Sequence, residues 1–416
     1  MKILTPTTAL LGSVVALAAP VEVDKRSTFG DITEHPKTSP TVSSLNLTYQ
    51  TNAGEHGTPR EWKDLHVAQI AAQKGGQDGQ FIDWKTFKSN GVNVGAWMEQ
   101  EKTHSEAWWN ALAPSALDEW NLCLDLGDRC GPVLEERYST LYAIEEYGMH
   151  VIIGLHSLPG GNQWSGYWRS LWARWFQNCT NLDYSFQAVR SILNFIERSG
   201  HLNGFTIAPL NEASDTNLVG FGSCAGLTAD GTNWITTYVK GVLAMVSEVD
   251  GRIPIMLQDC FCGAAFRSRL FGQEANLVVD SHVREGWKRG RLRERKGDEL
   301  TVTKVYYFAA SGVYAQYVSP AICGQASVLT SNSTFPVFVG EWSLQTMYNN
   351  TLDYRKTLFD TQRYAWQHYA SGGAFWTYNS TAVDPVDGEG ITEDYWSYGL
   401  LIDEGVITVE TNSSYC

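Results

Sequence analysis

Two glutamates each stand at the end of a short apolar run. Glu212 closes the segment Gly204–Glu212, and Glu341 lies near the end of Pro336–Trp342. Runs of this kind are typical of buried strands, and the carboxyl ends of the strands in a parallel β/α barrel meet on one face. Two carboxylates brought together there could cleave a glycosidic bond, one protonating the leaving oxygen while the other attacks or activates water. The pair therefore indicates a carbohydrate hydrolase.

The elements that must position this pair alternate along the chain. Amphipathic stretches with apolar residues at three- and four-residue spacing predict helices at residues 185–198, 234–249 and 354–369. Strand-like runs separate them, at residues 92–97, 150–156, 205–212, 253–259, 276–282, 337–342 and 373–378. Alternation of strand and helix over this length predicts an α/β fold, a closed (β/α)8 TIM barrel.

One strand of such a barrel is missing from the pattern. The interval between Trp97 and His150 contains two helical stretches, residues 108–126 and 138–147, and no β-branched run. We therefore expect seven strands instead of eight, with the second strand absent. A barrel that lacks one strand has two unpaired strand edges.

Six short motifs occur along the chain in a characteristic order. They are Gly91–Trp97, His156 with Pro159–Asn162, Leu210–Glu212, Asp280–His282, Gly340–Ser343 and Gly373–Trp376. Together they resemble the fungal exo-β-1,3-glucanases of glycoside hydrolase family 5, and the resemblance covers residues 90–405. It implies an eight-fold barrel in which the acid/base and the nucleophile end the fourth and seventh strands.

The resemblance also implies individual roles. Glu212 is expected to be the acid/base and Glu341 the nucleophile of a retaining mechanism, which needs no metal or organic cofactor. Asn211 is expected to hold the sugar 2-hydroxyl, while His156 and Trp376 line the subsite before the scissile bond. The full set of residues expected to bind the substrate or support the carboxylates is Glu101, His156, Asn211, His282, Tyr306 and Trp376. The acid of such a pair must hold its proton near neutral pH, which a neighbouring ionised carboxylate favours.

The motif at His282 is interrupted. In the family a tyrosine follows this histidine by two positions and hydrogen-bonds the nucleophile, but here residues 283–304 intervene, 22 residues of which 12 are charged. Removing them places Tyr306 at the family's position. Because valine codons begin with GT, lysine codons can end in AG and 22 codons keep the frame, we interpret the segment as a retained intron. A genuine basic surface loop is the alternative.

The N-terminal residues are typical of targeting and processing segments. Residues 1–19 combine one positive charge, a short apolar run and small residues, as a signal peptide does. Residues 20–60, rich in Ser, Thr, Pro and Gly and containing the dibasic Lys25–Arg26, are interpreted as a propeptide or flexible lead-in. The catalytic domain is then predicted to cover residues 61–416, with a non-native insertion at 283–304.

Composition and cysteine content agree with an exported protein. Six Asn-x-Ser/Thr sequons and an even set of eight cysteines favour secretion, with disulfides instead of a metal site, to the extracellular space or cell wall. The net charge of −14 argues against nucleic acid or an anionic membrane as partner. The 16 tryptophans suit stacking on sugars as well as a large core. We expect a monomer that takes a β-glucan polysaccharide or oligosaccharide.

Three interpretations of function remain open. The leading one is a secreted retaining hydrolase that releases glucose from β-1,3-glucan in fungal wall metabolism. The second is another β-glucan or β-mannan hydrolase on the same barrel, because loops set the subsites. The third is a catalytically inactive glucan-binding protein, since the family's second strand carries an Arg that braces the carboxylates and is missing here. His156 and His282 are also open to a purely structural role.

Overall fold

The computed structural model describes residues 79–95, 102, 106–116, 119–130, 133, 140–162, 175–216, 222–282, 315–346, 348–408 and 416. The predicted signal peptide at 1–19, the lead-in at 20–60 and the insertion at 283–304 lie outside these residues. Glu212 and Glu341 lie within them, and each of the seven predicted strands lies within or overlaps them.

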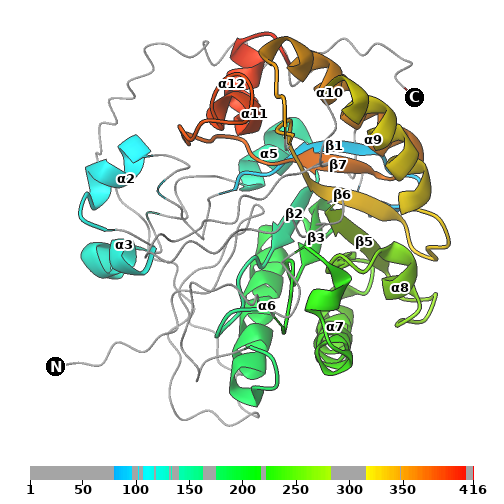
Figure 1. Ribbon diagram of the computed structural model, residues 1–416. Coiled ribbons are helices and arrows are strands. Elements are labelled where there is room, and N and C mark those ends of the chain that lie inside the picture. The colour runs from blue at the N-terminus through cyan, green and yellow to red at the C-terminus, as the bar shows by residue number, and fades with distance from the viewer. Residues whose placement is uncertain are drawn as a thin grey trace.

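Seven parallel strands form one curved sheet (Figure 1). The strands are β1 (Ser89–Val92), β2 (Val151–Gly154), β3 (Phe205–Ala208), β4 (Ile255–Gln258), β5 (Leu277–His282), β6 (Val337–Trp342) and β7 (Gly372–Phe375). Neighbours pair in the order β1-β7-β6-β5-β4-β3-β2, so β1 and β2 are the edges. In the part of the chain that is described, no strand lies between these edges. The prediction of an α/β barrel without its second strand is confirmed.

The first strand differs from its predicted range. The apolar pattern predicted residues 92–97, whereas β1 is Ser89–Val92 and pairs with Gly372–Phe375 of β7. Backbone pairing with β7 therefore places the strand on residues 89–92, a more polar segment than the apolar run that the sequence pattern favoured. The pairing depends on Gly372, which has a φ of +102° and whose added Cβ would lie 1.7 Å from the carbonyl oxygen of Ser89.

Helices lie between and after the strands along the chain, and the longer ones cover the outer side of the sheet (Figure 1). They are α2 (Glu106–Leu112), α3 (Glu119–Leu126), α5 (Thr140–Tyr147), α6 (Cys179–Ser199), α7 (Ala229–Asp250), α8 (Ala264–Ser268), α9 (Ala315–Leu329), α10 (Arg355–Tyr369), α11 (Glu393–Trp396) and α12 (Tyr398–Asp403). The predicted helix at 108–126 is two helices, α2 and α3. In Figure 1, α6 packs beside α7, and α9 packs beside α10.

The longest helices begin and end where their sequences supply caps. The Asn178 side chain accepts a hydrogen bond from the backbone N–H of Asn181 at the start of α6, and the Thr228 side chain accepts one from Gly231 at the start of α7. Such caps satisfy N–H groups that the first helical turn leaves unpaired. Helix α6 ends at Gly200, whose φ of +74° suits glycine.

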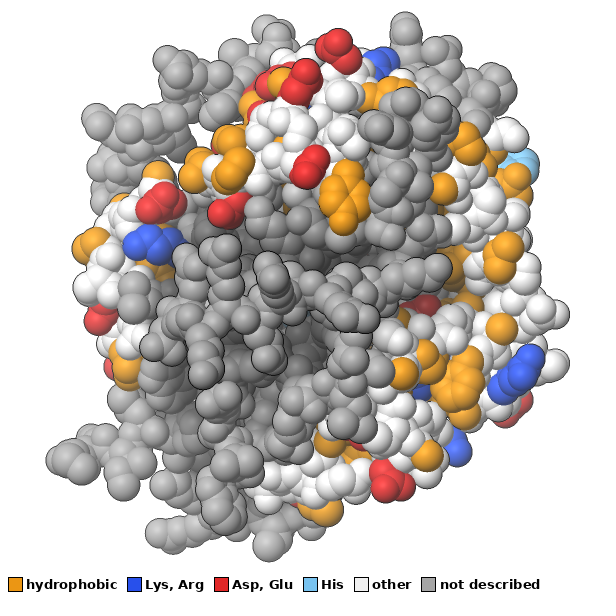
Figure 2. Space-filling model, in the orientation of Figure 1, with side chains coloured by type: hydrophobic (Ala, Val, Ile, Leu, Met, Phe, Trp, Pro, Cys, Tyr) orange, Lys and Arg blue, Asp and Glu red, His pale blue; other side chains and the backbone are white. Residues whose placement is uncertain are grey.

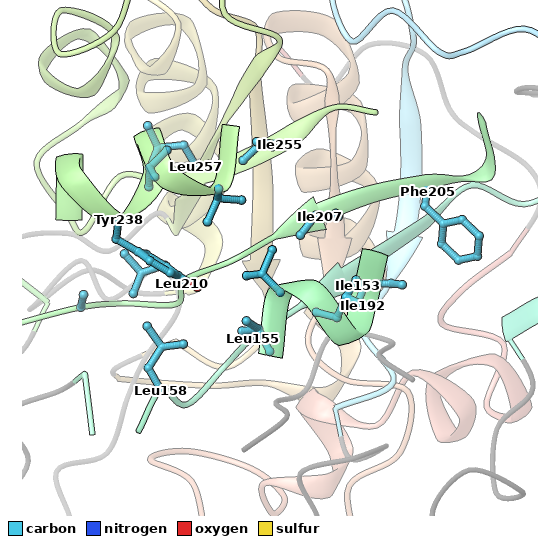
Figure 3. Packing of buried hydrophobic residues seen from close by; sticks show 14 of the residues in the cluster. Ile153, Leu155, Leu158, Ile192, Phe205, Ile207, Leu210, Tyr238, Ile255 and Leu257 are labelled. Carbon is cyan, nitrogen blue, oxygen red and sulfur yellow. The ribbon is translucent and has the colours of Figure 1, made fainter. Parts of the chain in front are cut away.

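Strand alternation separates the core into an outer and an inner layer. Outward residues of adjacent strands, such as Ile153, Ile207 and Ile255, pack against helical residues that include Ile192 and Tyr238 (Figure 3). Inward residues of five strands and Trp84, which precedes β1, form a smaller cluster inside the barrel: Trp84, Ala208, Met256, Val278, Phe338 and Ala374. On β5 the same inward face, continued toward the carboxyl end of the strand, supplies Asp280 and His282.

Three disulfides join Cys123 to Cys130, Cys224 to Cys262 and Cys323 to Cys416. The remaining two cysteines, Cys179 and Cys260, are free. The expectation of disulfides is confirmed for six of the eight cysteines. An even count did not imply complete pairing because Cys260 is buried beside β4 and Cys179 is exposed at the start of α6.

The surface carries mixed side chains. On the face shown in Figure 2, acidic, basic and hydrophobic side chains of the described residues are interspersed over the helices. The large hydrophobic residues that are exposed come from separate elements: Leu124, Tyr184, Phe266, Val328 and Val383. Among the described helices, none combines the length and the apolar composition needed to cross a bilayer.

Candidate active site

Glu212 lies in a tight turn just beyond β3. The strand ends at Ala208, and the next residue is Pro209, which has no N–H to continue the ladder. Glu212 adopts a φ of +41°, in the left-handed region that is uncommon for residues other than glycine. Such a conformation costs about 1–3 kcal/mol and persists only where surrounding contacts impose it. The turn therefore holds the Glu212 side chain in a direction that a regular strand would not give.

Glu341 is aimed by an irregularity within β6. Counting by twos along this strand puts Glu341 on the same face as Val337 and Val339, which point outward into the helical layer. The pairing with β5 shifts by one residue, however, so that Phe338 lies opposite Asp280 but Glu341 lies opposite His282. The pairing with β7 shifts over the same part of β6. A bulge of this kind re-aims a side chain, and here it turns Glu341 toward the inside of the barrel.

The two glutamates meet at His282. The Nδ1 atom of His282 lies 2.7 Å from Oε1 of Glu212 and 3.5 Å from Oε2 of Glu341. One oxygen of each carboxylate and this ring nitrogen all lie within 4.8 Å of one another. The exposed fractions of Glu212, Glu341 and His282 are 5%, 3% and 4%. The predicted convergence of the two carboxylates is thus present in the structure.

Asp280 contacts His282 from the other side of the ring and, with Glu341, raises its pKa. Its Oδ2 lies 3.3 Å from Nε2 of His282. Burial by itself lowers the pKa of His282, but the charges of Glu341 and Asp280 and hydrogen bonds to Asp280 and Glu212 outweigh it and hold the pKa well above the ordinary 6.5. The raised pKa favours the cationic form of His282, and its Nδ1 atom faces the carboxyl groups of both Glu212 and Glu341.

Asp280 is a site residue that the sequence reasoning missed. It belongs to the Asp280–His282 motif, and a separation of two residues places both side chains on the same face of β5. That spacing was the available signal. Both residues line a small cavity of about 20 Å³, together with Asn93. The Asn93 side chain donates to the carbonyl oxygen of Gly340, within the bulge that aims Glu341.

A second group of predicted residues lies at the same rim. The Nδ2 atom of Asn211 lies 3.2 Å from Nε2 of His156. The ring of His156 lies 5.6 Å from that of Trp376, tilted by 34°. The backbone N–H of Trp376 donates to the carbonyl oxygen of Trp342, the residue after Glu341. The structure thus brings His156, Asn211 and Trp376 together beside the two glutamates.

Two predicted site residues cannot be placed. Glu101 and Tyr306 both lie outside the described residues. Of the eight residues predicted for the site, the structure therefore positions six: Glu212, Glu341, His156, Asn211, His282 and Trp376.

The same centre is the place where a metal ion could be held. Glu212, His282 and Glu341 each offer one donor atom, and no other group of three such side chains converges as closely in the described part of the chain. The Nδ1 atom of His282 lies 2.7 Å from Oε1 of Glu212, which is a hydrogen-bond distance. A histidine binds a metal only in its neutral form, and these distances fit hydrogen bonding among the three side chains.

Similar proteins with named activities include a glucosidase and a rutinosidase. No family model matches the chain. It is 21% identical to a probable glucan 1,3-β-glucosidase A of Aspergillus niger over 312 residues, which make up 63% of this chain and 66% of that protein. The matched part thus spans just under two thirds of that relative.

Two solved structures are more similar. The crystal structure of a rutinosidase from Aspergillus niger is 33% identical, with a TM-score of 0.65, and the match covers 79% of this chain and 99% of that one. The crystal structure of AoRut is 31% identical, with a TM-score of 0.66 and the same coverage of both chains. Both matches extend over nearly the whole of the solved protein.

Proposed function

Because this chain belongs to glycoside hydrolase family 5, we propose that it cleaves β-glycosides with retention, with Glu341 as nucleophile and Glu212 as acid/base. The observation that carries the proposal is the meeting of both carboxylates at His282, with their nearest oxygens within 4.8 Å. Retaining enzymes separate their carboxyl groups by about 5–5.5 Å, whereas inverting enzymes need about 6.5–9.5 Å to admit a water. The distance here favours direct attack by Glu341.

The reaction follows from these positions. A carboxylate oxygen of Glu341 bonds to the anomeric carbon as the bond to the leaving oxygen breaks, and Glu212 gives its proton to that oxygen. The glycosyl ester leaves Glu341 neutral, so Glu212 can next take a proton from water while the water oxygen bonds to the anomeric carbon and releases Glu341. Asn211 is proposed to bind the sugar 2-hydroxyl, whose hydrogen bond strengthens in the transition state.

The remaining site residues are proposed to hold the sugar. His156 and Trp376, whose rings lie 5.6 Å apart, present adjoining surfaces for the sugar before the scissile bond. Glu101 and Tyr306 complete the set proposed from the family resemblance, and Tyr306 is proposed to hydrogen-bond Glu341 once residues 283–304 are removed. The cation on His282 is proposed to keep Glu341 ionised until attack, because a nearby positive charge favours the carboxylate.

The proposed substrate is β-1,3-glucan, attacked from one end to release glucose. The support is the relative named as a probable glucan 1,3-β-glucosidase. We further propose that residues 61–416 form the catalytic domain of a secreted monomer that acts on glucan outside the cell or in its wall, with residues 1–19 as signal peptide and 20–60 as lead-in. Three disulfides favour an oxidising compartment.

A rutinoside is the second candidate substrate. The observation that favours it is the 33% identity to a rutinosidase over 99% of that protein, against 21% identity to the glucosidase. A rutinoside is a glycoside of a disaccharide, so the enzyme would have to accept a second sugar beyond the one held by His156 and Trp376. The loops around the barrel mouth decide between the two, because subsites of a barrel enzyme lie in its loops.

One set of assays tests the proposal. Purified protein is incubated with a soluble β-1,3-glucan and, separately, with rutin, and the anomer of the released sugar is followed by proton NMR. The proposal expects β-sugar first, from one of the two substrates. Glucose alone at early times indicates attack from a chain end, and intact rutinose indicates the second candidate. An α-sugar product would contradict the retaining mechanism, and binding to insoluble glucan without any hydrolysis would favour an inactive binding protein.

Variants test the assignment of the two glutamates. In Glu341→Ala, added azide can attack the anomeric carbon directly from the face that Glu341 leaves open, and an α-glycosyl azide is expected. In Glu212→Ala, a substrate with a good leaving group still forms the glycosyl ester, and azide then gives a β-glycosyl azide. The opposite pattern of azide products would exchange the two roles.

A further inference from the structure

Asn162 joins the loop after β2 to the turn that carries Glu212. Its side chain is 2% exposed. The Oδ1 atom accepts a hydrogen bond from the backbone N–H of Leu158, 3.1 Å away, within its own loop. The Nδ2 atom leaves that loop and donates to the carbonyl oxygen of Asn211 at 2.5 Å. A single amide therefore holds both loops at a fixed separation.

The bonds from Asn162 lie on both sides of Glu212. The Asn211 carbonyl belongs to the peptide bond that precedes Glu212, and the backbone N–H of Ser214, two residues after it, donates to the carbonyl oxygen of Asn162 at 2.9 Å. Glu212, which lies between these two bonds, has the unusual φ of +41°. Because such a backbone conformation needs contacts that impose it, Asn162 is in a position to supply them.

Asn162 also reaches the residues around the proposed sugar site. Its Nδ2 lies 3.4 Å from the carbonyl oxygen of His156. The side chain of Asn211 in turn contacts the ring of His156. One buried amide thus connects the backbone of His156, Asn211 and the turn at Glu212.

A second asparagine makes similar contacts in a loop that does not carry Glu212. Asn350 is 1% exposed, and its Oδ1 accepts from the backbone N–H of Thr346, four residues earlier, as Asn162 does from Leu158. Its Nδ2 donates to the carbonyl oxygens of Thr346 and Asp387. Asn350 therefore has the burial and bonding pattern of Asn162 but holds a loop that does not carry Glu212.

We propose that Asn162 is a positioning residue for Glu212, holding the backbone of the turn so that the carboxyl group points at the leaving oxygen. The inference rests on the proposed function of Glu212 as acid/base. It predicts that loss of Asn162 impairs proton donation specifically, and not sugar binding or folding alone.

The test compares substrates that do and do not need a proton. Rates of glycosylation of Glu341 are measured with 2,4-dinitrophenyl β-glucoside, whose leaving group departs unprotonated, and with phenyl β-glucoside, whose leaving group requires Glu212. In Asn162→Ala we expect kcat/KM for the phenyl substrate to fall by about 10- to 100-fold, the loss typical of a misplaced catalytic group, and to change less than about threefold for the dinitrophenyl substrate. Asn350→Ala is the matched control, and its ratio of the two rates is expected to equal that of the wild type.

A second variant, Asn162→Asp, helps to separate a positioning effect from a folding defect. Asn162→Asp keeps the oxygen that accepts a hydrogen bond from the N–H of Leu158. It replaces the amide group that donates to the Asn211 carbonyl by a second carboxylate oxygen, which cannot donate when it is ionised. It is expected to reproduce the selective loss with the phenyl substrate, and the melting temperatures of both variants are measured so that loss of the fold is separated from loss of proton donation. Equal losses on both substrates, or no loss, would overturn the role of Asn162.

A crystal structure of Asn162→Asp separates this inference from the proposed function. We expect the Glu212 carboxylate to leave its position 2.7 Å from His282 Nδ1, or the φ of Glu212 to leave the left-handed region. An unmoved Glu212 overturns the positioning role whatever the activity. If the wild type cleaves neither aryl glucoside nor the natural glycosides, the proposed function fails, and the structure of the variant still decides whether Asn162 positions Glu212.

Discussion

Asp280 and His282 lie two residues apart on β5 and face each other, with 3.3 Å between Oδ2 of Asp280 and Nε2 of His282. The opposite nitrogen of the ring lies 2.7 Å from Glu212. The ring therefore connects a carboxylate deep in the barrel to the pair at its mouth. Its charge depends on Asp280 as well as on the two glutamates.

Replacing Asp280 by Asn should move the pH dependence of the reaction. Asp280 is among the groups that hold the pKa of His282 above its ordinary value, so removing its charge lowers that pKa. The cationic histidine is then lost at a lower pH, and the alkaline limb of kcat/KM against pH is expected to move down by about 1–3 pH units, the usual effect of an adjacent opposite charge.

The control for this prediction is Asp250→Asn. Asp250 is paired with the exposed Arg252 at the end of α7, so its replacement changes the net charge of the protein by the same amount at a remote position. Its pH profile should match the wild type. An alkaline limb that stays in place in Asp280→Asn would show that the charge of His282 does not limit the reaction.

Asp259 should make the protein less stable at neutral pH than in mild acid. It is 2% exposed, and burial raises its pKa to about 6, although hydrogen bonds from Ser281 and the backbone of Phe261 and the charge of His282 act against this. Because its pKa in the folded state is above the unfolded value of 3.8, the folded state binds the proton more tightly. Its contribution is favourable below the unfolded pKa and is lost as pH rises through about 6.

The measurement is urea unfolding of the wild type and Asp259→Asn at pH 4 to 8. Each pH unit between the two pKa values corresponds to about 1.4 kcal/mol, so the free energy of unfolding of the wild type should fall relative to the variant by up to about 3 kcal/mol between mild acid and pH 7. Asparagine can still accept from the N–H of Phe261, and the Ser281 hydroxyl can turn to accept from it. A difference between the two proteins that is the same at every pH would contradict the raised pKa.

Gly340 should tolerate no side chain, because the bulge of β6 brings it against Asp280. A Cβ atom at Gly340 would lie 2.0 Å from Oδ1 of Asp280. Gly340→Ala is therefore expected to lower the free energy of unfolding by about 1–3 kcal/mol, as overpacking does, and to reduce kcat by displacing Asp280 from His282. Gly251→Ala is the control, since the nearest atom to its added Cβ is 3.8 Å away. Equal stabilities of the two variants in urea would contradict the close approach.

The sequence predicted the site better than it predicted the local geometry that forms it. Glu212 and Glu341 were identified because buried strands end beside them, and the alternation of strands and helices required those ends to meet. The bulge that turns Glu341 inward could not be predicted, because a shift of pairing depends on both neighbouring strands. The φ of Glu212 is similarly a product of contacts from another loop, notably those of Asn162.

Elements whose sequences carry their own signals were predicted closely. Helix α10 was expected at residues 354–369 and is Arg355–Tyr369, and β6 was expected at 337–342 and is Val337–Trp342. The first strand was misplaced because its position is fixed by pairing with β7 and by the absence of a side chain at Gly372. Such long-range backbone contacts produce no apolar pattern in the sequence of the strand whose position they determine.

Removing residues 283–304 should restore the reaction if they are a retained intron. Strand β5 ends at His282, so the segment begins where the strand that carries His282 and Asp280 leaves the barrel. Deletion joins His282 to Val305 and places Tyr306 two residues after the histidine, the spacing that the family uses to hydrogen-bond the nucleophile. The deletion variant is expected to hydrolyse its substrate at least about tenfold faster than the full chain, since a lost hydrogen bond to a charged group costs about 1.5–3 kcal/mol.

The deletion is checked by kcat/KM and by sequencing the transcript across this region. Tyr306→Phe in the deleted background is the control, because it removes the hydroxyl and nothing else and should cancel most of the gain. A transcript without the segment, together with a faster deletion variant, would establish residues 283–304 as intronic. A transcript that retains it and a deletion variant with no gain would make the segment a genuine loop, and the tyrosine of the family would then have no equivalent beside Glu341.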